Sequence, residues 1–231
     1  MEDNELEYTA LFTKELFKPW RSEAWNYLSH FTYPWEALPG IHDFIIKLGA
    51  ALDSTEYIKH GDSAWVHKTA KIADLAFIGS GVIICADAEV RHCAYVRESA
   101  LVGSGAVVGN STELKNVILF DGVQVPHYNY VGDSILGFKS HMGAGSITSN
   151  VKSDSSLVSV AFEDSRIDTG LKKFGAILGD KVEVGCNAVL NPGTVVGAGA
   201  SIYPLSNVRG FVPANSIYKR QGEVVERHQQ M

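Results

Sequence analysis

The stretch that decides the fold covers residues 72–108 and reads IADLAFIGSGVIICADAEVRHCAYVRESALVGSGAVV. A bulky apolar residue stands at every sixth position of this stretch, and the same step extends beyond both of its ends. The series is Val66, Ile72, Ile78, Ile84, Val90, Val96, Val102, Val108, Leu114 and Phe120. A helix repeats every 3.6 residues and a half-buried strand every two, so neither explains a period of six. The period predicts a solenoid with coils of about 18 residues and three short strands per coil.

A second run keeps the same step further along the chain. Its members are Leu178, Val184, Leu190, Val196, Ile202 and Val208. A glycine follows many of the apolar positions in both runs, as at Gly79, Gly103 and Gly185. We expect each apolar residue to point into a narrow core. We expect each glycine to serve a tight corner where φ is positive.

The period of six also divides the chain. Residues 1–60 lack it, and their aromatic and aliphatic residues recur at helical spacing, which predicts a small helical cap over one end of the coil. The β-helix is expected over residues 61–213, followed by a C-terminal tail over residues 214–231. Residues 151–173 are polar and carry no hexad, so we expect an inserted loop there. A loop of that length in a solenoid is typical of a functional segment.

Composition argues against several classes of function. A net charge of −6 and a pI near 5.7 disfavour binding to nucleic acid or to an anionic membrane, because both need a basic surface. No apolar run reaches the ~18 residues of a membrane span. The first seven residues, MEDNELE, are acidic where a secretion signal would be basic. Three cysteines, an odd number, fit free thiols in a reducing compartment, so we expect a cytoplasmic protein.

The residues that can carry chemistry lie in residues 108–150, which read VGNSTELKNVILFDGVQVPHYNYVGDSILGFKSHMGAGSITSN. The linked motifs VGN, ELK, HYNYVGD and GAGSITSN resemble the acetyltransferase domain of the bifunctional enzymes that make UDP-N-acetylglucosamine. The hexads resemble the left-handed β-helix acyltransferase superfamily, and TGLKKFG at residues 169–175 is similar to archaeal sugar-phosphate nucleotidylyltransferases. The resemblance implies a mainly β fold with a left-handed parallel β-helix, a homotrimer, a sugar-phosphate acceptor and acetyl-CoA as cosubstrate.

The resemblance also implies roles for individual residues. His127 would be the general base, because an imidazole, with an ordinary pKa near ~6.5, suits proton transfer at neutral pH. The residues implied to bind the sugar phosphate are Arg97, Lys115, Tyr130, Asn150 and His141. An arginine fork and a lysine point charge suit a phosphate dianion. The residues expected to bind acetyl-CoA are Ala144 and Cys186, with Lys219 and Arg220 added for their position beyond the last coil.

Two further expectations concern the acyl donor. The backbone amides of Gly143-Ala144-Gly145 are expected to approach the thioester closely, because the glycines carry no side chain. Cys186 is not expected to act as a nucleophile, since the resemblance implies direct transfer. No metal site is predicted.

Some positions depart from the family pattern. His141 stands in place of an Asn beside the sugar, Val151 in place of a Tyr, and Ser156 in place of a loop Lys for which Lys152 or Lys172 can substitute. The first 60 residues hold no glycine-rich nucleotide loop and are too short for a Rossmann-like nucleotidyltransferase domain. These departures leave the acceptor sugar open, and with it whether the site is active.

Three functions therefore stay open at this point. The favoured one is an acetyl-CoA-dependent N-acetyltransferase acting on glucosamine-1-phosphate or a related amino-sugar phosphate. The second is a non-catalytic trimeric β-helix that binds a ligand or has a structural role. The third is a metal-dependent enzyme similar to β-helical carbonic anhydrases, although the closely spaced histidine pair of that family is missing. The histidines that raise this third possibility are His60, His67, His92, His127 and His141.

Overall fold

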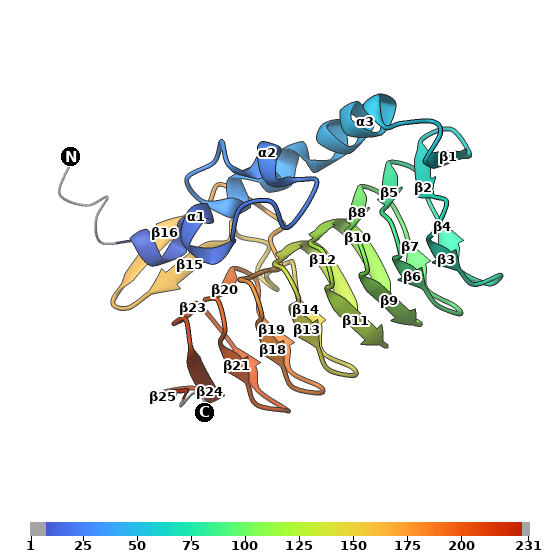
Figure 1. Ribbon diagram of the computed structural model, residues 1–231. Coiled ribbons are helices and arrows are strands. Elements are labelled where there is room, and N and C mark those ends of the chain that lie inside the picture. Colours follow the sequence, from blue (N-terminus) through green and yellow to red (C-terminus); the bar gives the residue numbers. More distant parts are fainter. Residues whose placement is uncertain (1–7, 228–231) are drawn as a thin grey trace.

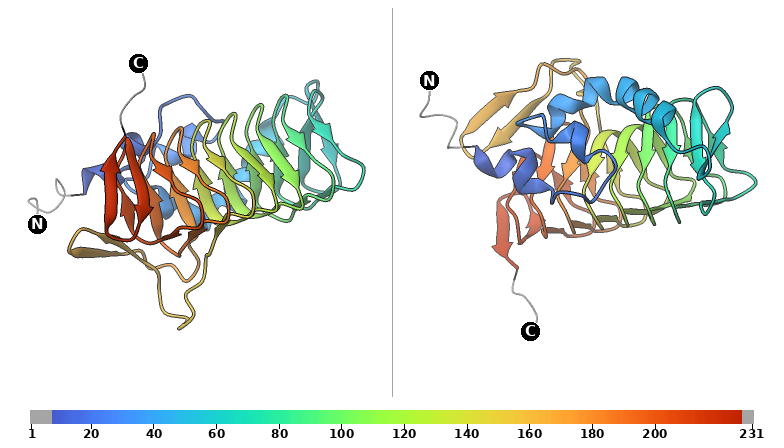
Figure 2. Two further views of the ribbon diagram at one scale, coloured as in Figure 1. Left: turned by 90° about the horizontal axis from the view of Figure 1, so that it is seen from below. Right: turned by 45° about the horizontal axis from the view of Figure 1, so that its top comes forward.

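A computed structural model describes residues 8–227 as a left-handed parallel β-helix with a helical layer along one side (Figures 1 and 2). Residues 1–7, whose acidic character was noted above, and residues 228–231 lie outside the described residues. The helical layer consists of η1 (Thr9–Leu11), α1 (Thr13–Leu16), α2 (Trp25–Leu28), η2 (Pro34–Gly40) and α3 (Ile41–Ala51). Within the described range, no helix is both long and apolar enough to cross a membrane.

The strands stack in three parallel ladders, one on each face of the solenoid. The cap face, which the helical layer covers, holds β2 (Ala64–His67), β5 (Val82–Ile84), β8 (Ala100–Val102), the second halves of β10 (Glu113–Leu119) and β12 (Tyr130–Leu136), β17 (Ala176–Leu178), β20 (Thr194–Val196) and β23 (Phe211–Val212). The second face holds β3 (Lys71–Ile72), β6 (Glu89–Val90), β9 (Val107–Asn110), β11 (Gln124–His127), β13 (His141–Met142), β18 (Glu183–Val184), β21 (Ser201–Ile202) and β24 (Ser216–Arg220). The third face holds β4 (Phe77–Ile78), β7 (Tyr95–Val96), the first halves of β10 and β12, β14 (Ile147–Thr148), β19 (Val189–Leu190) and β22 (Asn207–Val208).

Antiparallel strands occur at both ends of the solenoid and in the insertion. At the first end β1 (Tyr57–His60) pairs with β2, and at the other β24 pairs with β25 (Glu223–Glu226). The insertion folds into a hairpin of β15 (Ser159–Phe162) and β16 (Ser165–Asp168), and β15 contacts β20 and β23. The helices therefore end before the expected boundary at residue 60. The expected C-terminal tail begins instead with β24, which completes a coil by pairing with β21.

The inward-facing residues follow both apolar runs, with one exception. Val102 pairs with Leu119 of the next coil, and Leu119 pairs with Leu136, so the step from Leu114 to Leu119 is one residue short. The prediction that Phe120 faces inward in this series is therefore wrong. Its ring stacks on Phe17 of the helical layer, with ring centroids 4.8 Å apart. The physical reason is that β10 runs unbroken around its corner, as β12 does one coil later.

The glycines that follow the inward residues serve a different purpose from the one predicted. A Cβ atom at Gly109 would lie 1.6 Å from the carbonyl oxygen of Pro126 in the next coil, and one at Gly79 equally close to that of Arg97. Neither glycine has a positive φ, which occurs two residues later in each coil, at Ser111 and Gly81. These glycines are therefore required because successive coils stack backbone on backbone.

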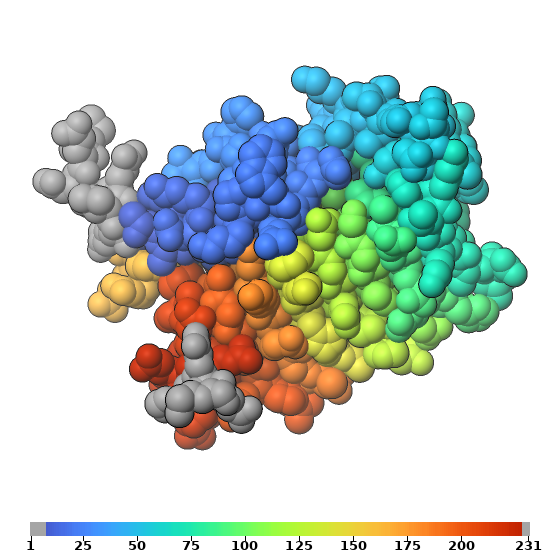
Figure 3. All heavy atoms as spheres, viewed as in Figure 1, coloured from blue at the N-terminus to red at the C-terminus, as the bar shows by residue number. Residues whose placement is uncertain are grey.

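The helical layer packs along the side of the solenoid, so the prediction of a cap over one end is wrong. Helix α3 contacts β5, β8 and β10, and η2 contacts β12. Figure 3 shows the layer lying directly on the coils. The reason is a ladder of fully buried outward-facing residues on the cap face: Ile83, Leu101, Ile118, Ile135, Ile177 and Val195. Burying each such side chain contributes about 1.5–3 kcal/mol, which favours covering this face.

Candidate active site

His127 ends β11 at the corner between the second and third faces. β11, β13, β18, β21 and β24 pair in parallel, each with the next. Counting three residues on from each pair brings four of the sequence-predicted residues into line along this corner: His127, Ala144, Cys186 and Arg220. Paired strands lie about 4.8 Å apart, so His127 and Ala144 are neighbours. We call this corner the His127 edge.

The backbone around His127 is fixed while its ring is free. Its N–H donates to Asn129 Oδ1 (3.1 Å), and its carbonyl accepts the N–H of Gly145 (3.0 Å). Asn129 is buried and donates in turn to the carbonyl oxygens of Gly143 (2.9 Å) and Ser146 (3.0 Å). The imidazole is exposed and makes no hydrogen bond within residues 8–227. It is therefore available to a substrate, on a corner held by Asn129. Sequence reasoning missed Asn129 because it gave the asparagine of HYNYVGD no role.

Some backbone N–H groups along the same edge donate hydrogen bonds within the chain, and others do not. Gly143 donates its N–H to Val184 (2.7 Å), and Gly145 donates to His127 as above. Among the described residues, the N–H groups of Ala144 and Cys186 have no acceptor. A Cβ at Gly143 would also lie 2.7 Å from the nitrogen of Cys186, so that glycine is needed for coil stacking. The donors left for a ligand are Ala144 and Cys186, and not the flanking glycines.

The far end of the His127 edge carries two cations. Lys219 Nζ lies 3.3 Å from one carboxylate oxygen of Glu223, and Arg220 Nε lies 2.7 Å from the other. Both pairs join β24 to Glu223, the first residue of β25. Two cations against one carboxylate leave this end of the edge positive.

A second cluster occupies the corner between the third face and the cap face, where β10 and β12 run through. We call it the Lys115 edge. Pairing of β7 with β10 puts Arg97 in register with Lys115. Arg97 Nη1 donates to Glu113 (3.0 Å), and Lys115 Nζ lies 3.8 Å from Asp133 Oδ1. Glu113 holds the pKa of Arg97 above its ordinary value.

Tyr130 and Asn150 belong to the same cluster. The Asn150 amide donates to Asp133 Oδ2 (2.5 Å) and to the hydroxyl of Tyr130 (3.3 Å). Burial raises the pKa of the Tyr130 hydroxyl, and the carboxylates of Asp133 and Glu113 add to the rise, so this hydroxyl stays protonated at neutral pH. The structure thus gathers Lys115, Tyr130 and Asn150 around Asp133. The sequence signal for Asp133 was its place in HYNYVGD, to which no role had been given.

The charges of the Lys115 edge are already balanced within the chain. Arg97 is paired with Glu113 and also lies 3.4 Å from Glu98. With Asp133 beside Lys115, three carboxylates face two cations. A phosphate group arriving here would have to compete with these carboxylates or approach from a side where the cations remain open.

The remaining predicted residues lie elsewhere. His141 is on the second face, where its Nδ1 is 2.9 Å from Glu183, and the structure does not bring it to the Lys115 edge. In the insertion, Lys152 Nζ donates to Ser156 Oγ (2.5 Å). Lys152 therefore stands beside the position of the expected loop lysine. Lys172 is exposed and Val151 is 46% exposed.

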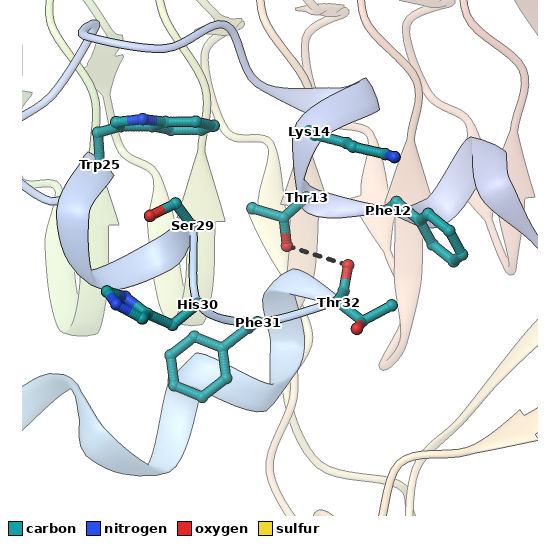
Figure 4. Close-up of a pocket in the computed structure, with 8 residues that line it drawn as sticks. All are labelled: Phe12, Thr13, Lys14, Trp25, Ser29, His30, Phe31 and Thr32. Atoms are coloured by element: carbon teal, nitrogen blue, oxygen red, sulfur yellow. Dashed lines mark hydrogen bonds between the residues drawn. The ribbon is translucent and has the colours of Figure 1, made fainter.

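The hollows described here open on the helical side of the molecule and not at either edge. Four hollows of about 210 to 690 Å³ open there, and neither His127 nor Lys115 lines any of them. Figure 4 shows one of about 300 Å³, between α1 and the segment that follows α2. Among the described residues, no three His, Cys, Asp or Glu side chains are placed together to hold a metal ion.

Comparison with known proteins gives the family. A family model described as the GMPPB C-terminal domain matches residues 86–197. A bifunctional sugar-1-phosphate nucleotidylyltransferase/acetyltransferase from Sulfurisphaera tokodaii is 33% identical over 126 residues, covering 54% of this chain and 31% of that protein. The bifunctional protein GlmU from Methanococcus maripaludis is 31% identical over 190 residues, covering 77% of this chain and 43% of the relative. The chain is an acyltransferase-like hexapeptide-repeat protein.

Within that family the chain is related to the C-terminal acetyltransferase domain of GlmU. It spans less than half the length of each of these curated relatives. Among solved structures, a hexapeptide transferase family protein from Anaplasma phagocytophilum superposes with a TM-score of 0.42 at 18% identity, covering 72% of this chain and 80% of that one.

Proposed function

We propose that this chain is an acetyl-CoA-dependent N-acetyltransferase whose acceptor is glucosamine-1-phosphate or a related amino-sugar phosphate. The observation that carries the proposal is the line formed by His127, Ala144 and Cys186 along one edge. An imidazole stands there beside two backbone amides, and none of the three has a hydrogen-bond partner in the part of the chain that the structure describes. A general base next to oxyanion donors is what acyl transfer from a thioester requires.

The chemistry follows from those groups. The acceptor amine attacks the thioester carbonyl while His127 takes the proton that the nitrogen releases. The N–H groups of Ala144 and Cys186 are the donors for the negative charge on the former carbonyl oxygen. The C–S bond then breaks, and the imidazolium returns the proton to the departing CoA thiolate. Lys219 and Arg220, further along the edge, would meet the phosphates of CoA.

The acceptor side belongs to the Lys115 edge. Lys115 and Arg97 would bind the phosphate, the lysine as a point charge and the arginine as a fork. The Tyr130 hydroxyl and the Asn150 amide would bind the sugar. His141 is a weaker candidate for the acceptor, because it is paired with Glu183 on a different face.

The proposal includes a homotrimer. Large apolar residues are exposed on the third face and along the His127 edge, at Leu75, Phe77, Tyr95, Tyr128 and Leu205, and their exposed fractions run from 45% to 79%. Exposed apolar residues that cluster in this way mark an interaction surface. The third face lies between the two edges, so a second copy packed on it would bring the Lys115 edge of one subunit towards the His127 edge of the next.

A non-catalytic role is the second candidate, and a specific observation favours it. Arg97 and Lys115 are both held by carboxylates of their own chain, which lowers their value as phosphate ligands. Together with Val151 in place of the family's tyrosine, this fits a relative that binds a ligand weakly or only assembles. The two candidate functions differ in whether the protein acetylates an acceptor.

The test is a thiol-release assay with acetyl-CoA and a panel of amino-sugar phosphates, run beside sedimentation equilibrium and metal analysis. We expect CoA release with at least one acceptor and a mass of about three times 25.1 kDa. A trimer that acetylates none of the panel supports the non-catalytic role. A bound stoichiometric metal with hydratase activity would favour the carbonic-anhydrase-like alternative, and a stable monomer would contradict both trimeric proposals.

A further inference from the structure

Asp133 joins three side chains of the Lys115 edge. Its carboxylate accepts hydrogen bonds from the amides of Asn116 (3.0 Å) and Asn150 (2.5 Å) and lies 3.8 Å from Lys115 Nζ. Strand pairing places Asn116, Asp133 and Asn150 at equivalent positions of three successive coils. Amide, carboxylate and amide therefore form a short ladder along the edge.

The carboxylate of Asp133 is held in a costly position. Its side chain is 7% exposed, and a buried carboxylate is destabilising unless it is paired and hydrogen-bonded. Its φ of +47° is uncommon for a residue other than glycine. Its carbonyl accepts the N–H of Gly175 (2.8 Å), where the chain returns from the insertion. Both the backbone and the side chain of Asp133 are thus fixed.

The ladder also reaches the helical layer. The amide nitrogen of Asn116 donates to the carbonyl oxygen of Leu38 in η2 (3.2 Å) as well as to Asp133. The contacts therefore run from the helical layer through Asn116 and Asp133 to Asn150. The helical layer has a structural connection to the proposed acceptor side.

Building on the proposed function, we propose that Asp133 is a positioning residue for the acceptor. It holds the Lys115 ammonium and the Asn150 amide where they meet the sugar phosphate, and Asn116 anchors this arrangement to the helical layer. Asp133 acts through these neighbours, because its own carboxylate is occupied by them. A phosphate dianion would in any case be repelled by that carboxylate.

The chain contains a matched control. Asp180 is 6% exposed, and its carboxylate accepts the backbone N–H groups of Lys18 (2.9 Å) and Phe138 (2.9 Å). These contacts tie the helical layer to the corner between the cap face and the second face. Asp180 therefore shares the burial of Asp133 and a link to the helical layer, but it touches no residue of either edge.

The experiment compares Asp133→Asn with Asp180→Asn in the full-length protein. An asparagine at 133 replaces one acceptor oxygen with a donor, which then opposes the amide of Asn116 or Asn150. We expect both variants to lower Tm. Only Asp133→Asn should raise KM for glucosamine-1-phosphate, by about tenfold or more, while KM for acetyl-CoA stays within about twofold.

A charge swap separates positioning from stability. Asn116→Asp alone places two carboxylates side by side and should raise KM for the acceptor. Combined with Asp133→Asn it restores a donor and an acceptor at both steps between residues 116, 133 and 150, while the Leu38 carbonyl oxygen loses its donor. We therefore expect the acceptor KM of the double variant to fall part of the way back to the parent value.

Three results would overturn the inference: an unchanged acceptor KM in Asp133→Asn, an equal rise in Asp180→Asn, or a double variant no better than Asp133→Asn. A parent protein that acetylates no acceptor would instead refute the proposed function, and this inference with it.

Discussion

The two edges of the third face are built in opposite ways. On the His127 edge the backbone is fixed by buried Asn129, while the imidazole and the amides of Ala144 and Cys186 have no hydrogen-bond partner within residues 8–227. On the Lys115 edge nearly every polar side chain is bonded to another, with Asp133 at the centre. Under the proposed function, the general base and the oxyanion donors are kept free, whereas the groups that would bind the acceptor are held by their neighbours. The predictions below test that contrast.

The largest effect is expected on the His127 edge. His127→Ala should lower kcat by about 10²–10⁴-fold, because a general base acts in the transition state. Affinity for acetyl-CoA should change little. Tm should also stay close to that of the parent, since the exposed ring contacts no other polar group of the described chain. Steady-state kinetics measure kcat and KM, and a melting curve measures Tm. A variant that keeps the parent's kcat would remove His127 from the mechanism and end the contrast between the edges.

A smaller effect, on KM rather than on kcat, is expected on the Lys115 edge. Lys115→Ala should raise KM for the sugar phosphate by about tenfold to a hundredfold, because a charged contact is lost and the buried Asp133 carboxylate loses its cation. Tm should fall as well, unlike in His127→Ala. Arg91→Ala is the control, since Arg91 pairs with Glu89 on the second face and not with a residue of the Lys115 edge. If Arg91→Ala raised the acceptor KM equally, overall charge rather than this site would account for the effect.

The smallest effect compares the three cysteines. Burial raises the pKa of the Cys85 thiol to about 12, so Cys85 should resist alkylation in the folded protein at neutral pH, where almost none of it is thiolate. Cys93 and Cys186 are exposed and should react with iodoacetamide. Acetyl-CoA should slow the labelling of Cys186 severalfold and leave Cys93 less affected, as peptide mass spectrometry can measure. Equal protection of the two exposed thiols would argue against a donor lying along the line from His127 to Arg220.

The sequence predicted the repeating parts of the molecule well. Both runs of inward residues follow from a pattern that recurs in each coil, and strand register confirms them except at Phe120. The family follows from the motifs of residues 108–150, and the comparisons confirm it. That exception arises because β10 shortens its coil by one residue without any break in the apolar character of the sequence. The sequence also contains a signal for the face on which the helical layer packs. Triplets such as Val82-Ile83-Ile84 are apolar at all three positions, which is typical of a strand buried on both faces.

By itself, then, the sequence determined the solenoid, because one apolar residue in six is enough to define an inward direction wherever the chain turns. The tertiary structure decided which residues stand side by side. The insertion lies between Asn150 and Gly175, so the alignment of Ala144 with Cys186 depends on how the chain re-enters the coil. The ladder of Asn116, Asp133 and Asn150 depends on two shortened coils. Contacts between coils are set by the length of each coil and by strand register, and the period of six in the sequence did not reveal the two coils that are one residue shorter.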